Sequence, residues 1–358
     1  MKKISLLLLL AITMNSCMEK KYEWSADVSA PKEYPVEVYT GAAGSYFFSQ
    51  MGGFSNSGWG SGIGDTEIIA PLPDRLDMTW LSYVDNKFYT GDWKLPTEKI
   101  QQLFDEGFHS RPGSEKESYD IIKIGLAPKG MVVVWVMGVG HQVEVTRFQA
   151  HETTIAPKLI TEDEKYMFRE NYSKDRLTND FVISKDVRQQ LGLYGYPAPE
   201  VYEAYREKYM WKPKIILPEG SKITSLYIKM CNGEFEDPYD GPIDQKNRAI
   251  PFAFHIFWSI GSGKKEERFV SRIAFTHDTE YWAKYLEADG DDDIPLDFDR
   301  NEIRQLFKNH IDKNKFAEMV IKIDPTKQED NSWVTNFYVE QGGKIYNVNQ
   351  ICQDSGKL

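Results

Sequence analysis

The hydrophobic and polar positions of this chain predict the same order of elements in two separate regions. The stretch from Trp93 to Phe104 matches the stretch from Leu296 to Phe307 at each apolar position, with an offset of 203 residues. Both begin as a short strand. From Ile100 and Ile303 onward, the apolar residues recur at the spacing of a helix that is buried on one face. We therefore expect one amphipathic helix in each half of the chain.

A pattern typical of three antiparallel strands follows each expected helix, with Pro and Gly at the turns. The expected strands are Ile121–Leu126, Met131–Met137 and His141–Phe148 in the first half, and Met319–Ile323, Ser332–Glu340 and Lys344–Ile351 in the second. Ile124 aligns with Ile321 at an offset of 197 residues, and Trp135 aligns with Trp333 at an offset of 198. We expect each aligned pair to occupy equivalent positions on equivalent strands.

Further strands are predicted before each helix: Tyr34–Thr40, Leu76–Val84 and Lys87–Trp93, and later Lys222–Cys231, Ile250–Ile260 and Phe269–His277. The expected fold class is therefore α+β, with two tandem related units at residues 22–150 and 215–352. Each unit is expected to hold an antiparallel sheet and one main helix, followed by a three-strand meander. The alternative is a chance match, because a helix followed by a hairpin is a common arrangement.

Residues 151–214 separate the two expected units and differ from both in composition. Glu162–Glu170 and Pro199–Met210 have the composition of helices. The segment also carries a group of aromatic residues that favour burial, namely Tyr194, Tyr202, Tyr205, Tyr209 and Trp211. A flexible linker is poor in aromatic residues, so we expect an ordered helical connector that lies over both units.

The N-terminus has the pattern of a secretory signal. Lys2 and Lys3 precede a short apolar run from Ile4 to Ile12, and small residues lead to Cys17. The segment before this cysteine resembles a bacterial lipobox, in which the thiol is acylated and the preceding residues are removed. We expect a signal peptide at residues 1–16 and a lipid-anchored tether at residues 17–21. The expected location is the membrane surface of the cell envelope. The alternative is an ordinary cleaved signal.

Charge excludes two classes of partner. The formal net charge of the whole chain is −11, and it becomes −13 without residues 1–16, which carry two lysines. Such an acidic surface disfavours nucleic acid, which is bound by neutralising phosphates, and polybasic attachment to anionic lipid. No later stretch is apolar for the ~18 residues of a membrane-spanning helix. The membrane is therefore expected as a partner only through the N-terminal lipid.

Two cysteines remain if Cys17 carries lipid. Cys231 ends one expected strand, and Cys352 directly follows another. In an oxidising compartment, two neighbouring strands would bring such a pair within bridging distance. A disulfide between Cys231 and Cys352 is one expectation, and two buried free thiols are the alternative.

The segment Gly41–Gly64 is the candidate functional surface. It combines eight glycines with aromatic residues, among them Tyr46, Phe54 and Trp59. Glycines allow close approach to a ligand, and aromatic rings supply flat contact area. No Gly-Lys-Ser/Thr follows, so this is not a phosphate-binding loop, and no cofactor motif is present elsewhere. The alternative is a packed loop without a ligand.

An acidic cluster is a weak candidate for a metal site. Asp289, Asp291 and Asp293 alternate, as ligands of Ca²⁺ do. The spacing departs from the calcium-loop pattern, because Ile294 occupies the sixth position and Arg300 the twelfth. The alternative is a solvent-exposed insertion that binds no metal. We expect this alternative, and the sequence predicts no cofactor.

No local motif predicts catalysis. The six histidines are scattered, and the chain lacks the spacings of zinc sites and of the nucleophile elbow. A pair formed by His255 and His277, with Asp278, remains open across strands. Two function classes follow: a non-enzymatic lipoprotein that binds a protein or glycan, and a hydrolase whose site is assembled across strands.

The first half resembles a known family. The pattern Leu72-Pro73 to Trp80, then Lys87-Phe88-Tyr89 and Leu95-Pro96, is similar to that of the bacterial domain-of-unknown-function 2931 lipoproteins, as is Gly58-Trp59-Gly60. The resemblance covers residues 22–148, and it implies no reaction and no catalytic residues. Some members are encoded near secretion-system toxins, so the resemblance also leaves open an immunity role against a secreted toxin.

Overall fold

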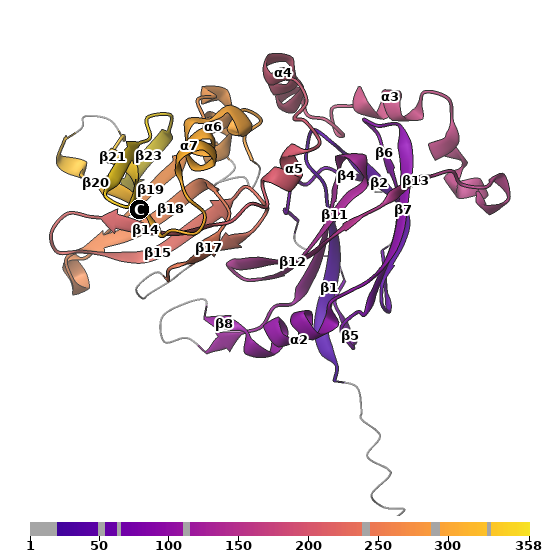
Figure 1. The fold of residues 1–358 in the computed structure, drawn as a ribbon, viewed down its shortest axis with the longest axis horizontal. Coiled ribbons are helices and arrows are strands. Elements are labelled where there is room, and N and C mark those ends of the chain that lie inside the picture. The colour runs from indigo at the N-terminus through magenta and orange to yellow at the C-terminus, as the bar shows by residue number, and fades with distance from the viewer. Residues whose placement is uncertain are drawn as a thin grey trace, which may run out of the picture.

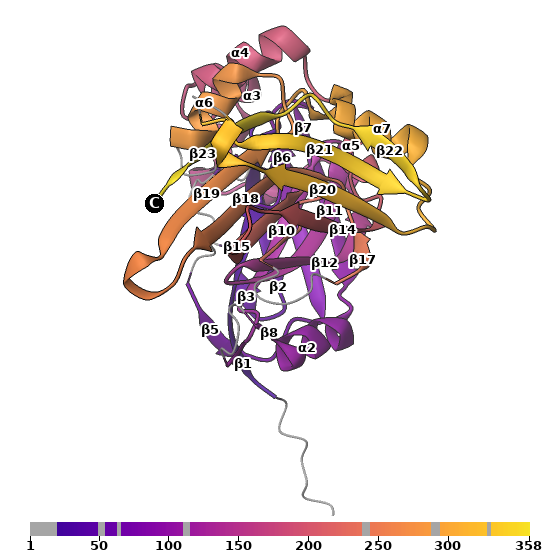
Figure 2. The ribbon, with the colours of Figure 1, turned by 90° about the vertical axis from the view of Figure 1, so that its left-hand side faces the viewer.

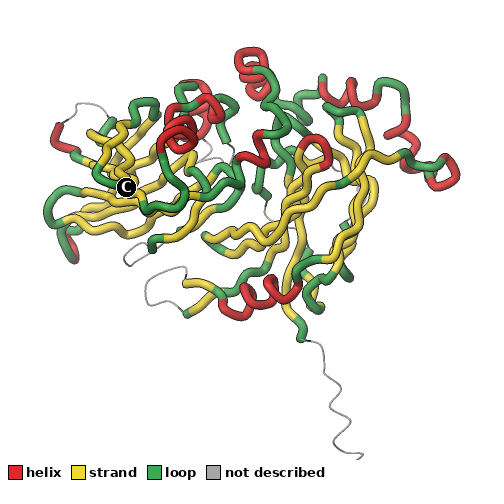
Figure 3. The backbone as a smooth tube through the Cα atoms, in the orientation of Figure 1, coloured by secondary structure: helices red, strands yellow, loops and turns green. Residues whose placement is uncertain are grey.

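The computed structural model describes residues 20–48, 54–62, 66–109, 115–237, 244–287, 294–327 and 331–358, and these form an α+β fold (Figure 1). Figure 3 shows strands through the middle of the molecule. Most helices lie along one side of it, and α2 lies at the opposite end. The expected N-terminal signal, tether and Cys17 fall outside the described residues, as do Asp289, Asp291 and Asp293.

Two facing sheets build the first half. In one, β1 pairs in parallel with β10, and β11 and β12 continue antiparallel from β10. Its strands are β5 (Ile68–Ala70), β1 (Tyr22–Ser29), β10 (Ile121–Ala127), β11 (Met131–Gly138) and β12 (His141–Gln149). The strands of the other are, in order, β13 (His151–Thr153), β7 (Lys87–Lys94), β6 (Arg75–Ser82), β2 (Val36–Ala43) and β3 (Tyr46–Phe47), with β4 (Phe54–Ser55) also on β2. The helix α2 (Thr97–Glu106) connects β7 to the β8–β9 pair (Phe108–His109 and Lys116–Glu117), which precedes β10.

The second half has two sheets with the same order of pairing. Here β14 pairs in parallel with β20, and β21 and β22 follow antiparallel. The strands of this sheet are β17 (Lys246–Arg248), β14 (Tyr209–Ile216), β20 (Ala317–Ile323), β21 (Val334–Gln341) and β22 (Lys344–Asn347). The facing strands are β15 (Ser221–Met230), β18 (Pro251–Ile260), β19 (Glu267–Ala274) and β23 (Cys352–Lys357). The helices α6 (Thr279–Glu287) and α7 (Glu302–His310) lie between β19 and β20 in the chain.

A ten-stranded sheet runs through both halves. The short strand β16 (Phe235–Glu236) pairs with β12 from the first half and with β15 from the second. The sheet of β1 and β10 to β12 therefore continues into β15, β18, β19 and β23. Figure 2 shows the strands of the second half in front of those of the first. The two halves share main-chain hydrogen bonds as well as side-chain contacts.

The expected antiparallel units need two corrections. Each half holds two sheets rather than one, and the strands β1 and β14, which the pattern did not predict, pair in parallel with β10 and β20. Trp135 and Trp333 are not equivalent, because Trp135 lies within β11 whereas Trp333 precedes β21. The ring of Trp333 instead packs on Trp258 and Phe269.

The expected helices bury the faces that their spacing predicts. In α2, Ile100 and Phe104 are buried against the sheets of the first half. In α7, Ile303 and Phe307 take the corresponding places in the core of the second half. The side chain of Asn301 caps α7 by accepting a hydrogen bond from the Ile303 N–H at 3.0 Å, which satisfies a donor that the first turn leaves free.

The connector carries helices, as predicted, and packs on the first half. It contains two 3-10 helices (Pro157–Leu159 and Glu162–Phe168), α3 (Tyr172–Leu177), α4 (Lys185–Tyr194) and α5 (Val201–Ala204). The buried carboxylate of Glu37 on β2 accepts hydrogen bonds from Tyr166 and Tyr172 of the connector, both at 2.8 Å, and from Tyr83 at 2.5 Å. The connector ends earlier than expected, since β14 already begins at Tyr209.

Candidate functional site

A cleft of about 1020 Å³, including the solvent at its mouth, lies where the connector meets the second half. One wall is α4, which contributes Asp186, Val187 and Gln190, and the opposite wall is α6. Lys32 and Glu33, which follow β1, close one end. The cleft is thus assembled from three segments that lie far apart in the sequence.

Helix caps and one ion pair hold the two walls. The Ser184 hydroxyl caps α4 by accepting a hydrogen bond from the Val187 N–H at 3.3 Å. The Lys284 ammonium of α6 pairs with the Asp186 carboxylate of α4, so the walls are joined across the cleft. Both partners are about half exposed, and the pair therefore fixes the geometry more than it stabilises the fold.

Aromatic residues of α6 form the floor of the cleft. Tyr281 and Tyr285 are buried, and the hydroxyl of Tyr285 lies 2.6 Å from Nε2 of His255 on β18. Burial, together with the positive charges of Lys229 and Arg272, lowers the pKa of His255 to about 3. The imidazole is therefore neutral at physiological pH.

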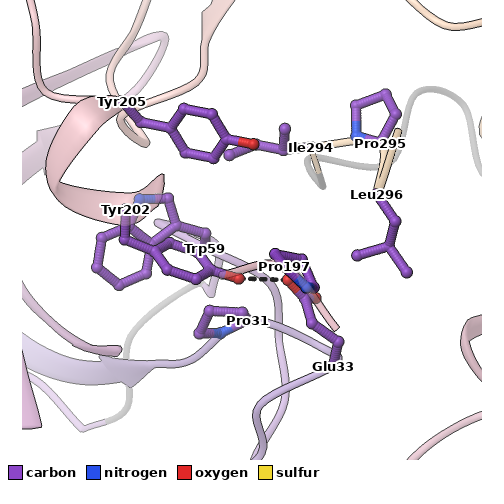
Figure 4. A pocket seen from close by; sticks show the side chains of 9 residues that line it. All are labelled: Pro31, Glu33, Trp59, Pro197, Tyr202, Tyr205, Ile294, Pro295 and Leu296. Atoms are coloured by element: carbon purple, nitrogen blue, oxygen red, sulfur yellow. Dashed lines mark hydrogen bonds between the residues drawn. The ribbon is translucent and has the colours of Figure 1, made fainter. Parts of the chain in front are cut away.

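A second, inner pocket of about 310 Å³, including the solvent at its mouth, opens beside the cleft (Figure 4). It shares Glu33, Ile294 and Leu296 with the cleft. Its other residues are three aromatic side chains and three prolines, namely Trp59, Tyr202, Tyr205, Pro31, Pro197 and Pro295. In Figure 4, the Tyr202 and Tyr205 side chains come from one side and Ile294, Pro295 and Leu296 from the other. Both halves and the connector contribute to this pocket.

Glu33 is the charged group of the inner pocket. Only 9% of this residue is exposed, and burial raises the pKa of its carboxyl group. The Tyr202 hydroxyl donates a hydrogen bond to Oε1 of Glu33. Burial, together with the nearby Glu33, raises the pKa of Tyr202 well above its usual value, so this phenol remains a proton donor.

Two of the three aromatic residues of the expected Gly/aromatic surface are buried. Tyr46 is 7% exposed and packs on Trp24, whereas Trp59 is 3% exposed and packs edge-on against Trp135, with ring centroids 4.9 Å apart. Both therefore lie in the core. The side chain of Phe54 lies outside the described residues, and its backbone belongs to β4. Of the three candidates, Trp59 lines the inner pocket.

Gly60 of this segment lies at the contact between the two halves. The carbonyl oxygen of Gly60 accepts hydrogen bonds from the Gln142 amide at 2.8 Å and from the buried Lys123 ammonium at 3.1 Å. The backbone of Gly60 lies against Gly233, on a turn of the second half. The same Gln142 amide donates to the Gly233 carbonyl at 2.6 Å. The loop 58–62 therefore fastens the halves together.

The expected disulfide does not form. Cys231 and Cys352 are both free thiols. Cys231 directly follows β15 and Cys352 begins β23, and the strands β18 and β19 lie between them in the sheet. Three interstrand spacings amount to ~14 Å, about twice the largest Cα separation that a disulfide spans.

The histidines expected to pair across strands have different partners. Nδ1 of His277 lies 2.9 Å from Oδ2 of the buried Asp297, whereas His255 contacts Tyr285. Asp278 instead caps α6. Within the described ranges, no group of three His, Cys, Asp or Glu residues is placed to hold a metal ion.

The described residues that line the cleft do not include a hydroxyl or thiol nucleophile hydrogen-bonded to a general base. Ser184 is the aliphatic hydroxyl of the lining, and within the described part of the chain its oxygen has no histidine or carboxylate within hydrogen-bond distance. Sequence reasoning missed Glu33 and the residues of α4 and α6, since no local motif marks them. The single available signal was the group of connector tyrosines, which were predicted to be buried.

Among the described residues, no helix has the length and apolar character needed to cross a membrane. A sequence model of the family described as "Protein of unknown function (DUF2931)" matches residues 12–198, which cover the first half and most of the connector. No curated protein and no solved structure matches the chain. The match extends over more than half of the chain, and the protein therefore belongs to the DUF2931 family.

Proposed function

We propose that this protein is an exported lipoprotein of the cell envelope, anchored by lipid on Cys17, which binds a protein or glycan partner in the cleft between α4 and α6. The observation that carries the proposal is the cleft itself. It combines tyrosine side chains with separately placed charged and amide groups, and among the described residues none acts as a base toward Ser184. Such a mixture of apolar surface and few polar groups is typical of ligand sites.

The position of the cleft suits an anchored protein. The chain enters β1 at Tyr22, beside β5 and α2, and reaches Glu33 only after the far end of β1 (Figure 1). At ~3.3 Å per residue, the eight residues of this strand separate the two ends by roughly 25 Å. A lipid at Cys17 would therefore leave the cleft facing away from the membrane.

The test of binding is a pull-down from envelope extract together with a glycan array. Gln190→Arg places a bulky cation in the cleft from α4, and it should abolish capture of the partner. Leu193→Arg changes the same helix at a residue that is 66% exposed and does not line the cleft, so it should leave capture intact. Equal capture by both variants would place the binding surface elsewhere.

The test of the anchor is metabolic labelling with a clickable fatty acid. The wild-type protein should be labelled, and Cys17→Ser should not. Labelling of both to the same extent would contradict acylation at this cysteine.

A hydrolase remains the second candidate, because Glu33 is a buried carboxyl with a raised pKa beside a cleft. Groups of this kind serve as general acids. Turnover of a generic ester, glycan or peptide substrate that Glu33→Gln abolishes would establish this candidate over binding alone. The absence of turnover in both proteins would favour the binding role.

We also infer that the two halves arose by duplication. The same order of pairing supports this, and so does a pair of irregularities. β2 has a bulge after Val38, which lies opposite Trp80, and β15 has a bulge after Ile223, which lies opposite Trp258. A bulge inserts a residue at one point of a ladder and is retained within families. An experimental structure should superpose Trp80 on Trp258 and Ile100 on Ile303.

A further inference from the structure

The inner pocket combines three aromatic rings with one carboxyl group. The ring centroids of Trp59 and Tyr202 lie 5.3 Å apart at 65°, and those of Tyr202 and Tyr205 lie 6.0 Å apart at 80°. The rings are thus turned strongly against one another instead of stacking. Pro31, Pro197 and Pro295 complete the walls of the pocket.

Glu33 forms no ion pair with a described residue, although the positive charge of the neighbouring Lys32 acts on its carboxyl group. Among the described residues, no Lys, Arg or His lies within ion-pair distance of its carboxylate, and the Tyr202 hydroxyl is its side-chain donor. Burying an ionised carboxylate without a cation is costly, and an opposite charge placed beside it removes most of that cost. The pocket therefore holds a site for positive charge that the described chain leaves unfilled.

Aromatic faces favour the same kind of guest. The negative face of an aromatic ring attracts ammonium groups, and cages of several rings bind them most strongly when water is excluded. A carboxylate next to such rings selects ammonium groups that also carry an N–H, because it accepts charge-assisted hydrogen bonds. Guests of this kind are alkylamines such as the end of a lysine side chain.

We propose that the inner pocket binds the protonated primary amine of the ligand, with Glu33 accepting its N–H groups and the rings of Trp59, Tyr202 and Tyr205 surrounding it. This deepens the proposed binding function and rests on it. The free interior of the pocket holds little more than one water-sized group, which matches an ammonium group and excludes a larger part of the ligand. The remainder would pass Ile294 and Leu296 into the larger cleft, which shares these two residues.

Binding should release a proton. Burial raises the pKa of Glu33, so the empty pocket shifts its carboxyl group towards the protonated form. An ammonium group favours the ionised form and displaces that proton to solvent. Proton release is measurable by calorimetry in buffers of different ionisation enthalpy, and a purely structural role of Glu33 would not produce it.

The experiment titrates purified protein comprising residues 22–358 with two amines. Nα-acetyl-lysine amide represents an amine from a peptide, and glucosamine represents an amine from an amino sugar. Their neutral counterparts are norleucine amide acetylated at Nα and N-acetylglucosamine. One amine should bind and its neutral counterpart should not. Glu33→Gln should weaken that amine by about tenfold or more, which corresponds to about 1.4 kcal/mol. Tyr202→Phe, which keeps the ring and removes one hydroxyl, should change affinity less.

Glu219→Gln is the matched control, because Glu219 is exposed in the turn before β15 and lines neither the inner pocket nor the cleft. It should leave the affinity unchanged. Equal binding of an amine and its neutral counterpart, no binding of either amine, or no effect of Glu33→Gln would each overturn the proposal. If Gln190→Arg still abolished partner capture in that case, the cleft would stand and the amine assignment alone would fall.

Discussion

Replacing Gly60 by alanine tests whether the loop 58–62 fastens the two halves. Gly60 has φ of +79°, a conformation that L-residues adopt at a cost of about 1–2 kcal/mol. A Cβ atom there would lie 2.8 Å from Cα of Gly233 and 2.9 Å from its carbonyl oxygen. Contacts this short with main-chain atoms force the halves apart, and overpacking of this kind typically costs about 1–3 kcal/mol. The expected loss of unfolding free energy for Gly60→Ala is therefore about 2–5 kcal/mol.

Gly220 provides the matched control. Its φ is +80°, and a Cβ atom there would meet nothing within 4 Å. Gly220→Ala should therefore cost only the conformational part, about 1–2 kcal/mol. The difference between the two variants isolates the contact with the second half.

The measurement is equilibrium unfolding of residues 22–358 in urea, followed by tryptophan fluorescence, which also reports on the packing of Trp59 against Trp135. Unchanged m-values would allow the midpoints to be compared as stabilities. If the two variants lose the same free energy within about 0.5 kcal/mol, Gly60 is not wedged against Gly233, and the account of the loop is wrong.

Three further predictions concern the core and the connector. The pKa of His255 falls from 6.5 to about 3 on folding, so below pH 6.5 the unfolded chain binds one more proton than the folded chain. Each pH unit of acidification below 6.5 should therefore lower the unfolding free energy by about 1.4 kcal/mol. Thermal unfolding between pH 7 and 5 should show that the stability of His255→Gln depends less steeply on pH than that of the wild type. Glu37→Gln weakens three charge-assisted hydrogen bonds to tyrosines, so limited proteolysis should cut residues 157–194 faster while the sheets stay protected. Leu306→Ala should cost about 2–5 kcal/mol in urea unfolding, whereas Lys308→Ala, exposed on the same helix, should stay within about 0.5 kcal/mol.

The candidate site was hardly predictable from sequence. The glycine-rich segment indicates Trp59 as a candidate for ligand binding. Trp59 lines the inner pocket, although its side chain is buried. Glu33 carries no local signal, because its chemistry depends on burial beneath Tyr202, 169 residues further along the chain. A functional carboxyl group differs from the many others of the chain only in its surroundings, and the surroundings of Glu33 form only when the connector packs on the two halves.

Periodicity along the chain is enough to predict the elements whose buried positions repeat within a few residues. Periodicity predicts the buried helical face that carries Ile303 and Phe307, because buried helix positions recur every three or four residues. It also predicts the strand β18 and the meander after each helix, because buried strand positions recur every two residues. The α+β class followed from the order of these elements.

The pairing of segments that are distant along the chain, in contrast, is visible only in the folded molecule. The parallel pairing of β1 with β10 joins Val28 to Ile124, and no local pattern records such a partner. No local pattern records that β18 and β19 lie between Cys231 and Cys352 in the sheet. Nor does one record that Gly60 must be a glycine because its backbone lies against Gly233 of the other half. Periodicity along the chain fixes which face of an element is buried, whereas the partner on that face is chosen by packing over the whole molecule.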